Sequence, residues 1–303
     1  MVDTDSVSAV IVHFRTPDET VRAARAVAET FRCPIVVVDN ASGDGIADRL
    51  AAEAPRARVV AEPENRGYGA ACNRGAAETA GAYLLFLNSD AFVAPGAVEA
   101  LAGALDADPR AAAVGPRLVN PDGSLQPSIC RLPTPWRIFC ESSGLAALSG
   151  GRGFLRGHTK TREDHGRAQA VTALTGAALL VRRSAFEGVG GFDESFFLYA
   201  EETDLITRLQ RRGYRILYEP RAAVMHVGGA SGGDVLFGEL HGALCQYVEK
   251  FHGRTAARFA SVVLALGAAA RYAAALVTPG DAGRRRRTRY RAALARRTRS
   301  VRP

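Results

Sequence analysis

Short apolar runs alternate with amphipathic stretches along the first 118 residues of the chain. The runs are rich in Val, Ile and Leu, which is typical of strands buried on both faces. Such strands are predicted at Val7–Phe14, Ile35–Val38, Arg58–Ala61, Tyr83–Leu87 and Ala112–Gly115. Helices are predicted to begin at Pro17, behind the cap Thr16, and near Asp44, and to cover Gly69–Thr79 and Pro95–Leu105. This alternation predicts an α/β fold with a mainly parallel, Rossmann-like sheet flanked by helices.

The pattern is looser after residue 118. The predicted elements are a strand at Ala177–Val181, an amphipathic helix at Glu202–Arg212, a strand at Arg215–Tyr218 and a helix over Asp234–Phe251. Ser149–Gln169 has no clear period and is expected to form a loop, serving as a lid. We expect one domain over residues 1–232, with halves at about 1–118 and 119–232, a helical C-terminal extension over 233–280, and an Arg-rich tail without regular structure over 281–303.

The positive charge of the chain is concentrated at one end. The whole sequence has 39 Lys and Arg against 31 Asp and Glu, but residues 284–303 alone hold ten Arg and no acid. The remainder has 29 basic and 31 acidic residues, so the high isoelectric point describes the tail and not the domain. A basic groove for nucleic acid along the domain is therefore not expected.

The cysteines and the termini favour a cytoplasmic protein. The five Cys are scattered without a C-x-x-C pair, a pattern that favours neither a disulfide framework nor a zinc site. The N-terminal residues MVDTDSV are acidic where a signal peptide needs positive charge. The longest apolar run, Phe259–Ala270, is interrupted by Arg271 and is shorter than the roughly 20 residues of a spanning helix.

Polar residues follow two of the predicted strands, at the edge where ligands of such sheets bind. Asp39 and Asn40 come after IVVV, and Asn88-Ser89-Asp90 comes after YLLFL. Asp39 could accept a hydrogen bond from a nucleobase or a ribose hydroxyl, or could stabilise a turn. Asp90 could hold Mg²⁺ or Mn²⁺ shared with a diphosphate, or could hydrogen-bond its own turn.

A second group of candidate residues lies later in the chain. Glu201 and Glu202 begin a predicted helix, where acids also stabilise the helix dipole. They follow the apolar segment Phe196–Tyr199, and a carboxylate beside apolar groups has the raised basicity of a general base. His226 follows a strand-like run and could complete a metal shell or be structural. Signatures of dinucleotide dehydrogenases and P-loop NTPases are missing at the expected places in the sequence.

The ordered motifs VVVDNASGDG, ENRGYGAACNRG, LLFLNSDAFVAPGAV and LTGAALLVRRSAFEGVGGFDESFFLYAEETDL resemble those of family 2 glycosyltransferases of the GT-A fold, in the rhamnosyltransferase-like branch. The resemblance covers about residues 7–232 and rests on several motifs in the right order. It implies an inverting transfer of a sugar from a nucleotide-diphosphate donor to an acceptor hydroxyl, with a divalent Mg²⁺ or Mn²⁺ ion as cofactor.

The same resemblance implies roles for individual residues. Asp39, with Asn40, matches the acid that contacts the nucleobase, and Arg66 matches a residue near the nucleotide. Asn88-Ser89-Asp90 stands where the family has its metal-binding Asp-x-Asp. Because Asn88 replaces the first acid, Asp90 is expected to carry most of the metal ligation, with the nucleotide also contacted by Asn88 and Ser89. His226 matches a histidine that joins the metal in some members.

Glu201 and Glu202 stand at the family's Glu-Asp pair, whose second acid is the expected base. Glu202 is one methylene longer than the usual Asp, a departure that leaves Glu201 as an alternative base. The resemblance favours dTDP-rhamnose as donor, with UDP sugars open. The acceptor would be a lipid-linked or polysaccharide glycan of the cell envelope, or a small natural product. Two alternatives remain: a sugar-phosphate nucleotidyltransferase and a catalytically inactive glycosyltransferase-like scaffold.

The C-terminal region suggests a membrane partner. Arg254–Leu276 has an apolar centre with Arg at its edges, a composition that suits a membrane interface. The cluster Arg284–Arg287 could bind anionic headgroups. The sequence therefore predicts a peripheral enzyme at the inner face of the cell membrane, and the alternative is a helix packed on the domain with a solvated tail.

Overall fold

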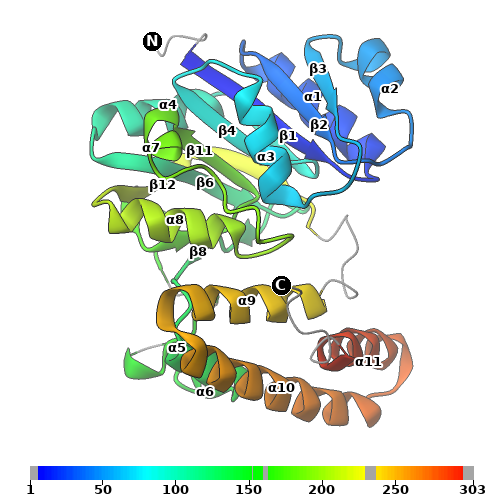
Figure 1. Cartoon of the computed structure of the whole chain (residues 1–303), viewed down its shortest axis with the longest axis vertical. Coiled ribbons are helices and arrows are strands. Elements are labelled where there is room, and N and C mark those ends of the chain that lie inside the picture. The colour runs from blue at the N-terminus through cyan, green and yellow to red at the C-terminus, as the bar shows by residue number, and fades with distance from the viewer. Residues whose placement is uncertain (1–5, 152, 160–162, 229–236, 296–303) are drawn as a thin grey trace. The chain divides into compact units, whose positions relative to one another are not determined.

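The computed structural model describes residues 6–151, 153–159, 163–228 and 237–295 (Figure 1). The chain divides into two compact units. Unit 1 comprises residues 1–130, 163–197 and 201–231, and unit 2 comprises residues 131–162, 198–200 and 232–303. Segment 131–162 therefore groups with the C-terminal helices, although the sequence placed it in the same domain as its neighbours.

Unit 1 is built on a mixed sheet with strand order β3-β2-β1-β4-β11-β6-β12-β5. The strands are β1 (Val7–His13), β2 (Ile35–Asp39), β3 (Ala57–Ala61), β4 (Tyr83–Asn88), β5 (Ala91–Val93), β6 (Ala111–Val119), β11 (Ala178–Arg182) and β12 (Arg215–His226). Strands β1 to β4 are parallel, β11 runs antiparallel between β4 and β6, and β12 is parallel to β6. The short strand β7 (Leu125–Gln126) pairs antiparallel with β6, and β9 (Gln169–Val171) pairs antiparallel with β12. Strands β8 (Ile129–Cys130) and β10 (Ala173–Leu174) form a separate antiparallel pair.

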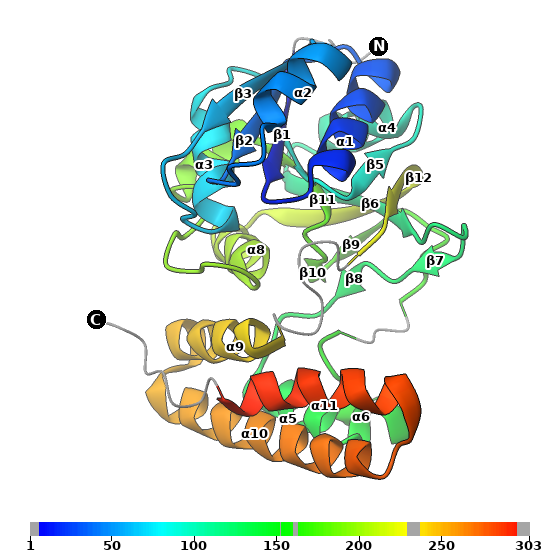
Figure 2. The same cartoon turned by 90° about the vertical axis from the view of Figure 1, so that its right-hand side faces the viewer.

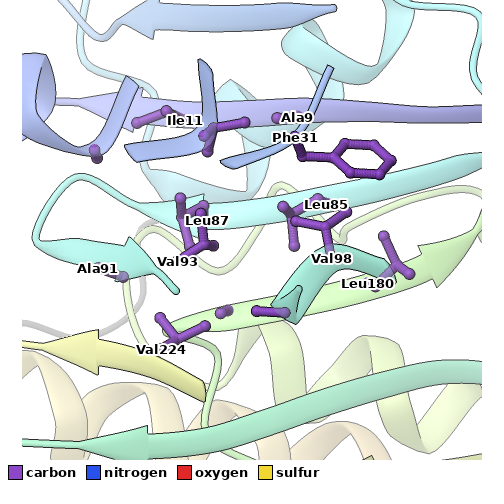
Figure 3. Close-up of a cluster of buried hydrophobic side chains, with 14 of the residues drawn as sticks. Ala9, Ile11, Phe31, Leu85, Leu87, Ala91, Val93, Val98, Leu180 and Val224 are labelled. Atoms are coloured by element: carbon purple, nitrogen blue, oxygen red, sulfur yellow. The ribbon is translucent and has the colours of Figure 1, made fainter. Parts of the chain in front are cut away.

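Helices cover both faces of this sheet (Figure 2). They are α1 (Pro17–Thr30), α2 (Ile46–Glu53), α3 (Tyr68–Ala77), α4 (Ala97–Ala107), α7 (Arg183–Gly188) and α8 (Glu201–Arg211). Figure 3 shows part of the core, where Ile11, Leu85 and Val98 belong to one buried cluster. On the other face, Gly75 of α3 lies so close to the sheet that an added Cβ would be 2.4 Å from a methyl group of Val10. Burial on both faces explains why these strands are continuous apolar runs.

The predicted fold class is confirmed, and local differences include the following three. Strand β12 continues past Tyr218 to His226 because a bulge between Glu219 and Ala223 lets it remain paired with β6. Thr16 does not cap α1 with its side chain, and its hydroxyl instead bonds that of Ser89 at 2.9 Å. The segment expected to be a loop over 149–169 contains the short 3-10 helix η2 (Gly153–Leu155) and ends where β9 begins.

Unit 2 is helical in its described part. It contains α5 (Pro135–Ser142), α6 (Leu145–Leu148), α9 (Phe237–His252), α10 (Arg254–Leu276) and α11 (Gly280–Ala295). Helix α10 packs against α5, α9 and α11. Residues 280–295 form a regular helix where the sequence predicted an irregular tail, and residues 296–303 lie outside the described residues.

Helix α10 is longer than the apolar run that the sequence analysis found too short to span a membrane. Arg271 does not end the helix, which runs for 23 residues and is long and apolar enough to cross a membrane by length and composition. Only 28% of its most apolar window is buried within the structure.

Candidate active site

Three parallel strands end side by side and bring the predicted strand-end residues to one edge of the sheet. His13 at the end of β1 pairs in register with Asp39 at the end of β2. Val12 pairs with Asn88 at the end of β4. The sequence expectation that Asp39 and Asn88 lie at a common edge is therefore met by the register of the sheet.

Asp90 and His226 form a direct pair at this edge. Strand β5 begins just after Asp90, and its first residue, Ala91, pairs antiparallel with His226. The His226 Nε2 atom lies 3.3 Å from Asp90 Oδ1, and the backbone N–H of Gly228 donates to Asp90 Oδ2 at 3.1 Å. The Asp90 side chain is buried. The pairing of β5 with β12 thus brings Asp90 to His226 and to Gly228, which is 138 positions away in the chain.

Gln126 fixes the orientation of the His226 ring. Its amide nitrogen donates to Asn120 Oδ1 at 2.9 Å and to the His226 carbonyl at 3.3 Å, so its Oε1 faces the ring. The ring Nδ1 lies 2.7 Å from that oxygen and donates to it. This leaves Nε2 directed toward Asp90, an arrangement of the kind that orients metal-binding histidines.

The separation of Asp90 Oδ1 and His226 Nε2 fits a shared divalent ion, which would take the place of the proton between them. Burial opposes ionisation of Asp90, but the hydrogen bond and charge of His226 outweigh it and hold the pKa of Asp90 below its usual value. Two ligands of one octahedral Mg²⁺, each at about 2.1 Å, lie about 3 Å apart, close to the separation of these two atoms. Across the described ranges, no group of three or more His, Cys, Asp or Glu is placed to hold a metal. Two protein ligands are consistent with an ion whose other ligands are substrate phosphates and water.

Asn40 ties the end of β2 to the loop that carries Arg66. Its amide nitrogen donates to Asn65 Oδ1 at 2.9 Å and to the Gly67 carbonyl at 3.2 Å. Its Oδ1 accepts from the backbone N–H of Arg66 at 3.2 Å. Asn40 is buried, so its role in the structure is to hold this loop against the end of β2.

The loop is packed in turn against the chain that leads into α8. Gly67 has φ of 92°, and an added Cβ would lie 2.2 Å from the Phe197 carbonyl oxygen, so only glycine fits. That oxygen also accepts from the backbone N–H of Tyr68 at 3.0 Å. The Arg66 guanidinium, which is half exposed, bonds Glu194 at 2.6 Å.

Two other predicted nucleotide contacts make local hydrogen bonds in the structure. Asp39 Oδ1 accepts from the backbone N–H of Ser42 at 2.9 Å, as in a turn. Ser89 is buried and its hydroxyl bonds Thr16. Their nucleotide-binding roles, like those of Asn40, Arg66 and Asn88, stay predictions.

Glu201 and Glu202 begin α8 behind a strained backbone. Tyr199 and Ala200 both have left-handed φ angles, of 69° and 64°, which non-glycine residues seldom adopt outside functional sites. Glu201 is buried, and among the described residues its Oε2 has no hydrogen-bond partner. Gly69 lies beneath it, since an added Cβ there would be 3.6 Å from the Glu201 Cβ.

The two carboxyl groups differ in their tendency to ionise. Burial, and then the neighbouring charge of Glu202, raise the pKa of Glu201 well above its usual value. Burial raises the pKa of Glu202 as well, but hydrogen bonds from its own backbone and from Thr203 oppose that shift. Both carboxyl groups therefore have a raised pKa, and the shift is larger for Glu201 than for Glu202.

A short chain of contacts joins Glu202 to the Asp90 turn. An added Cβ on Gly176 would lie 3.0 Å from Glu202 Cγ, so the Glu202 side chain rests on the Gly176 backbone. The next residue, Ala177, accepts at its carbonyl from the backbone N–H of Asn88 at 3.0 Å. The base candidate and the metal-ligand candidate thus belong to neighbouring segments of unit 1.

Sequence reasoning missed several residues that hold this edge together. His13 is fully buried, with its ring 2.7 Å from the Thr20 hydroxyl and 3.1 Å from the Asp44 carboxylate. His13 could have been found from the sequence, because it lies at the end of the first strand, and Asp39 and Asn88 are candidates because of the same position at strand ends. Gln126 and Gly176 carried no such signal, since their roles depend on pairing between distant segments.

Comparison with known sequences identifies the class. Residues 8–190 match the profile described as "Glycosyl transferase family 2", and the chain belongs to that family. It is 35% identical over 207 residues to the N-acetylglucosaminyl-diphospho-decaprenol L-rhamnosyltransferase of Mycobacterium tuberculosis strain H37Rv. That match covers 63% of this chain and 66% of the relative, just under two thirds of its length.

Comparison with solved structures supports the fold. The mannosyltransferase PcManGT from Pyrobaculum calidifontis, in complex with GDP-Man and Mn²⁺, has a TM-score of 0.60 at 18% identity, covering 98% of this chain and 87% of that one. GalNAc-T7 with UDP, GalNAc and Mn²⁺ has a TM-score of 0.61 at 14% identity, covering 96% of this chain and 55% of that one. At these identities the likeness is one of fold.

Proposed function

We propose that the chain is an inverting, metal-dependent glycosyltransferase that moves a sugar from a nucleotide-diphosphate donor to an acceptor hydroxyl. The observation that carries the proposal is the arrangement at one sheet edge of the Asp90–His226 pair and, through Gly176 and Ala177, of Glu202. Family membership and the named activity of the mycobacterial relative support rhamnose as the favoured sugar. The resemblance of the sequence motifs favours dTDP as its carrier. The diphospho-decaprenol in the same name favours a lipid-linked saccharide as acceptor.

In this proposal Asp90 Oδ1 and His226 Nε2 hold a divalent ion, with Gln126 keeping the ring in place. When bound, the ion offsets the negative charge that develops on the departing nucleotide diphosphate. Asp39, Asn40, Arg66, Asn88 and Ser89 are proposed to form the nucleotide side of the site. Asn40 would act by holding the Arg66 loop.

Glu202 is proposed as the general base. Its ionised carboxylate takes the proton of the acceptor hydroxyl as the oxygen bonds to the anomeric carbon, while the bond from that carbon to the phosphate oxygen breaks on the opposite face. Glu201 keeps its proton beside it, so the site does not carry two adjacent charges. If the neighbouring Glu201 were also ionised, its negative charge would make Glu202 harder to ionise.

The proposal is tested by measuring nucleoside-diphosphate release and sugar transfer with Mg²⁺ and dTDP-rhamnose. Glu202→Gln should lower kcat by about 10²- to 10⁴-fold with little change in donor affinity. Asp90→Ala should reduce both turnover and donor binding. Glu53→Gln, an exposed change on α2, is the matched control and should leave both unchanged. Wild-type turnover by Glu202→Gln under chemistry-limited conditions would rule out the base assignment, and pyrophosphate release from a nucleoside triphosphate would point to a nucleotidyltransferase.

We further propose that the enzyme works as a peripheral protein at the inner, cytoplasmic face of the cell membrane, where a lipid-linked acceptor is presented. The apolar composition of α10 and the arginines of α11 support this location.

A further inference from the structure

Exposed apolar side chains gather on unit 2. Eight of the eleven large exposed apolar residues of the described chain belong to it. They are Trp136, Leu148, Phe154, Phe259, Val262, Leu266, Leu276 and Val277. Several are far more exposed than an isolated surface residue needs to be, including Leu266 at 66% and Phe154 at 76%. A gathering of this kind marks a binding surface.

Helix α10 has its large apolar residues facing outward. Phe259, Val262 and Leu266 follow the spacing of one helix face and are exposed. The same face continues through exposed alanines to Leu276. The inward face is made mostly of smaller residues, which are Ala257, Ala260, Leu264, Gly267, Ala268 and Ala275. A helix that only packed on its own unit would have the opposite distribution.

An aromatic cluster extends this face beyond α10. The Phe259 ring lies 6.3 Å from that of Phe139, which stacks on Trp136 at 5.3 Å. Trp136 in turn lies 4.6 Å from Phe154, between ring centroids. The three described segments α5, η2 and α10 therefore contribute to one continuous surface. We call this surface, comprising Trp136, Phe139, Phe154, Phe259, Val262 and Leu266, the apolar face.

The charge of unit 2 decides what kind of partner fits. Unit 2 has 20 Lys and Arg against 5 Asp and Glu, whereas unit 1 has 19 against 26. Arg258 is exposed next to Phe259, and α11 exposes Arg284, Arg285 and Arg286. A second copy of the chain would bring two strongly positive units together, which is unfavourable. An anionic lipid bilayer offers both an apolar layer and negative headgroups.

Contacts that bind α10 to α5 oppose a crossing of the bilayer by this helix. The Arg271 guanidinium donates to the carbonyls of Ser142 at 2.8 Å and Glu141 at 3.1 Å, which binds the C-terminal part of α10 to α5. Gly267 approaches the same turn so closely that an added Cβ would be 3.1 Å from the Ser142 carbonyl. Crossing the bilayer would require these contacts to break and would place Arg271 in hydrocarbon.

We propose that the apolar face docks on an anionic lipid bilayer, with α10 lying in the plane of the interface and the arginines of α11 contacting headgroups. The inference deepens the peripheral location given above and rests on the proposed function for its purpose, the capture of a lipid-linked acceptor. It adds α5 and η2 to the docking surface, which the sequence had confined to the C-terminal region.

The test is co-sedimentation of the full-length protein with vesicles of phosphatidylcholine alone and of phosphatidylcholine with 30% phosphatidylglycerol, a composition of about one anionic lipid in three. The protein should bind the anionic vesicles, and more weakly as salt rises. The double change Val262→Gln with Leu266→Gln should weaken binding at least tenfold, because it removes apolar area that enters the interface. Val262→Ile with Leu266→Met keeps that area and should bind like the wild type. Both positions are exposed, so folding should persist and is checked by thermal unfolding.

A second variant pair separates charge from apolar contact. Arg284 to Arg287 changed to Gln should also lower binding to anionic vesicles, whereas changing the same four to Lys should preserve it. Failure of the full-length protein to bind either vesicle, or equal binding by the double Gln variant, would overturn the proposal. A dimer in light scattering that the double Gln variant abolishes, without vesicle binding, would assign the face to a second copy instead.

The outcome is independent of the proposed chemistry because vesicle binding needs no turnover. Transfer to a short-chain, water-soluble acceptor should be unchanged in the double Gln variant, while transfer to a vesicle-embedded acceptor should fall. Loss of both would indicate damage to the catalytic unit and would count against the docking role of the apolar face.

Discussion

Gly176 offers a direct way to perturb the base without altering it. An added Cβ at this position would lie 3.0 Å from Glu202 Cγ, 3.1 Å from its Cβ and 3.3 Å from its carboxyl carbon. Ordinary contacts of this type begin near 3.4 Å, so Gly176→Ala should displace the Glu202 side chain by about 0.4 Å. The change leaves both carboxyl groups and the metal-ligand pair chemically intact.

The magnitude follows from how steeply reaction rates depend on geometry. A misplacement of about 1 Å at a reacting group costs about 10²-fold, so about 0.4 Å should cost roughly three- to tenfold in kcat. The free energy of unfolding should change by less than about 1 kcal/mol, because the neighbour that must move is a side chain with rotatable bonds. Donor affinity should be unaffected, since the base acts on the acceptor.

The assay is single-turnover sugar transfer with saturating donor, so that chemistry and not product release is observed. Gly103→Ala is the matched control: it lies inside α4 with nothing within 4 Å of an added Cβ. That control should stabilise the protein by about 0.5–1 kcal/mol and leave the rate unchanged. A Gly176→Ala rate equal to that of the wild type, with unaltered unfolding, would refute the position assigned to the base.

Three further predictions concern the supports of the site. Glu201→Gln should remove a loss of stability that the wild type shows as pH rises. Because folding raises the pKa of Glu201, this side chain contributes its full stability below its unfolded pKa of about 4.3. That contribution is lost as pH rises through the folded pKa of Glu201. Chemical denaturation should therefore show the wild type losing stability relative to the variant as pH rises above 5, and parallel pH profiles would contradict this. Gln126→Leu should raise the Mg²⁺ concentration for half-maximal activity by about 10- to 100-fold through loss of His226 orientation, with kcat at saturating metal near normal. Gly67→Ala should destabilise the fold by more than about 2 kcal/mol, because an added Cβ would overlap the Phe197 carbonyl and the φ of 92° is unfavourable for alanine; an unchanged urea midpoint would exclude this.

The fold of unit 1 could be predicted because its strands are buried on both faces and its helices are amphipathic. The apolar runs ending at Asp39 and Asn88 gave the strand boundaries to within a residue or two. The antiparallel insertion of β11 could not be predicted, because its apolar run has the same composition as those of the parallel strands. The length of β12 depends on a bulge that only its pairing with β6 explains.

Candidate residues could be predicted where a local rule places them, and their partners could not. Asp90 follows a strand and Glu202 begins a helix, so position alone drew attention to them. The approach of His226 to Asp90 arises from the pairing of β5 with β12. The outward-facing apolar residues of α10 also could not be distinguished from inward-facing ones, since a helix rich in alanine is apolar all round.

The central claim is that Asp90 and His226 hold the ion that binds the donor diphosphate. The most direct measurement is anomalous diffraction from crystals grown with Mn²⁺ and dTDP. The account predicts one anomalous peak at ligation distance, about 2–2.3 Å, from both Asp90 Oδ1 and His226 Nε2, with the diphosphate as its other ligand. Bound dTDP with no peak at this pair, or with its manganese held by other residues, would contradict it.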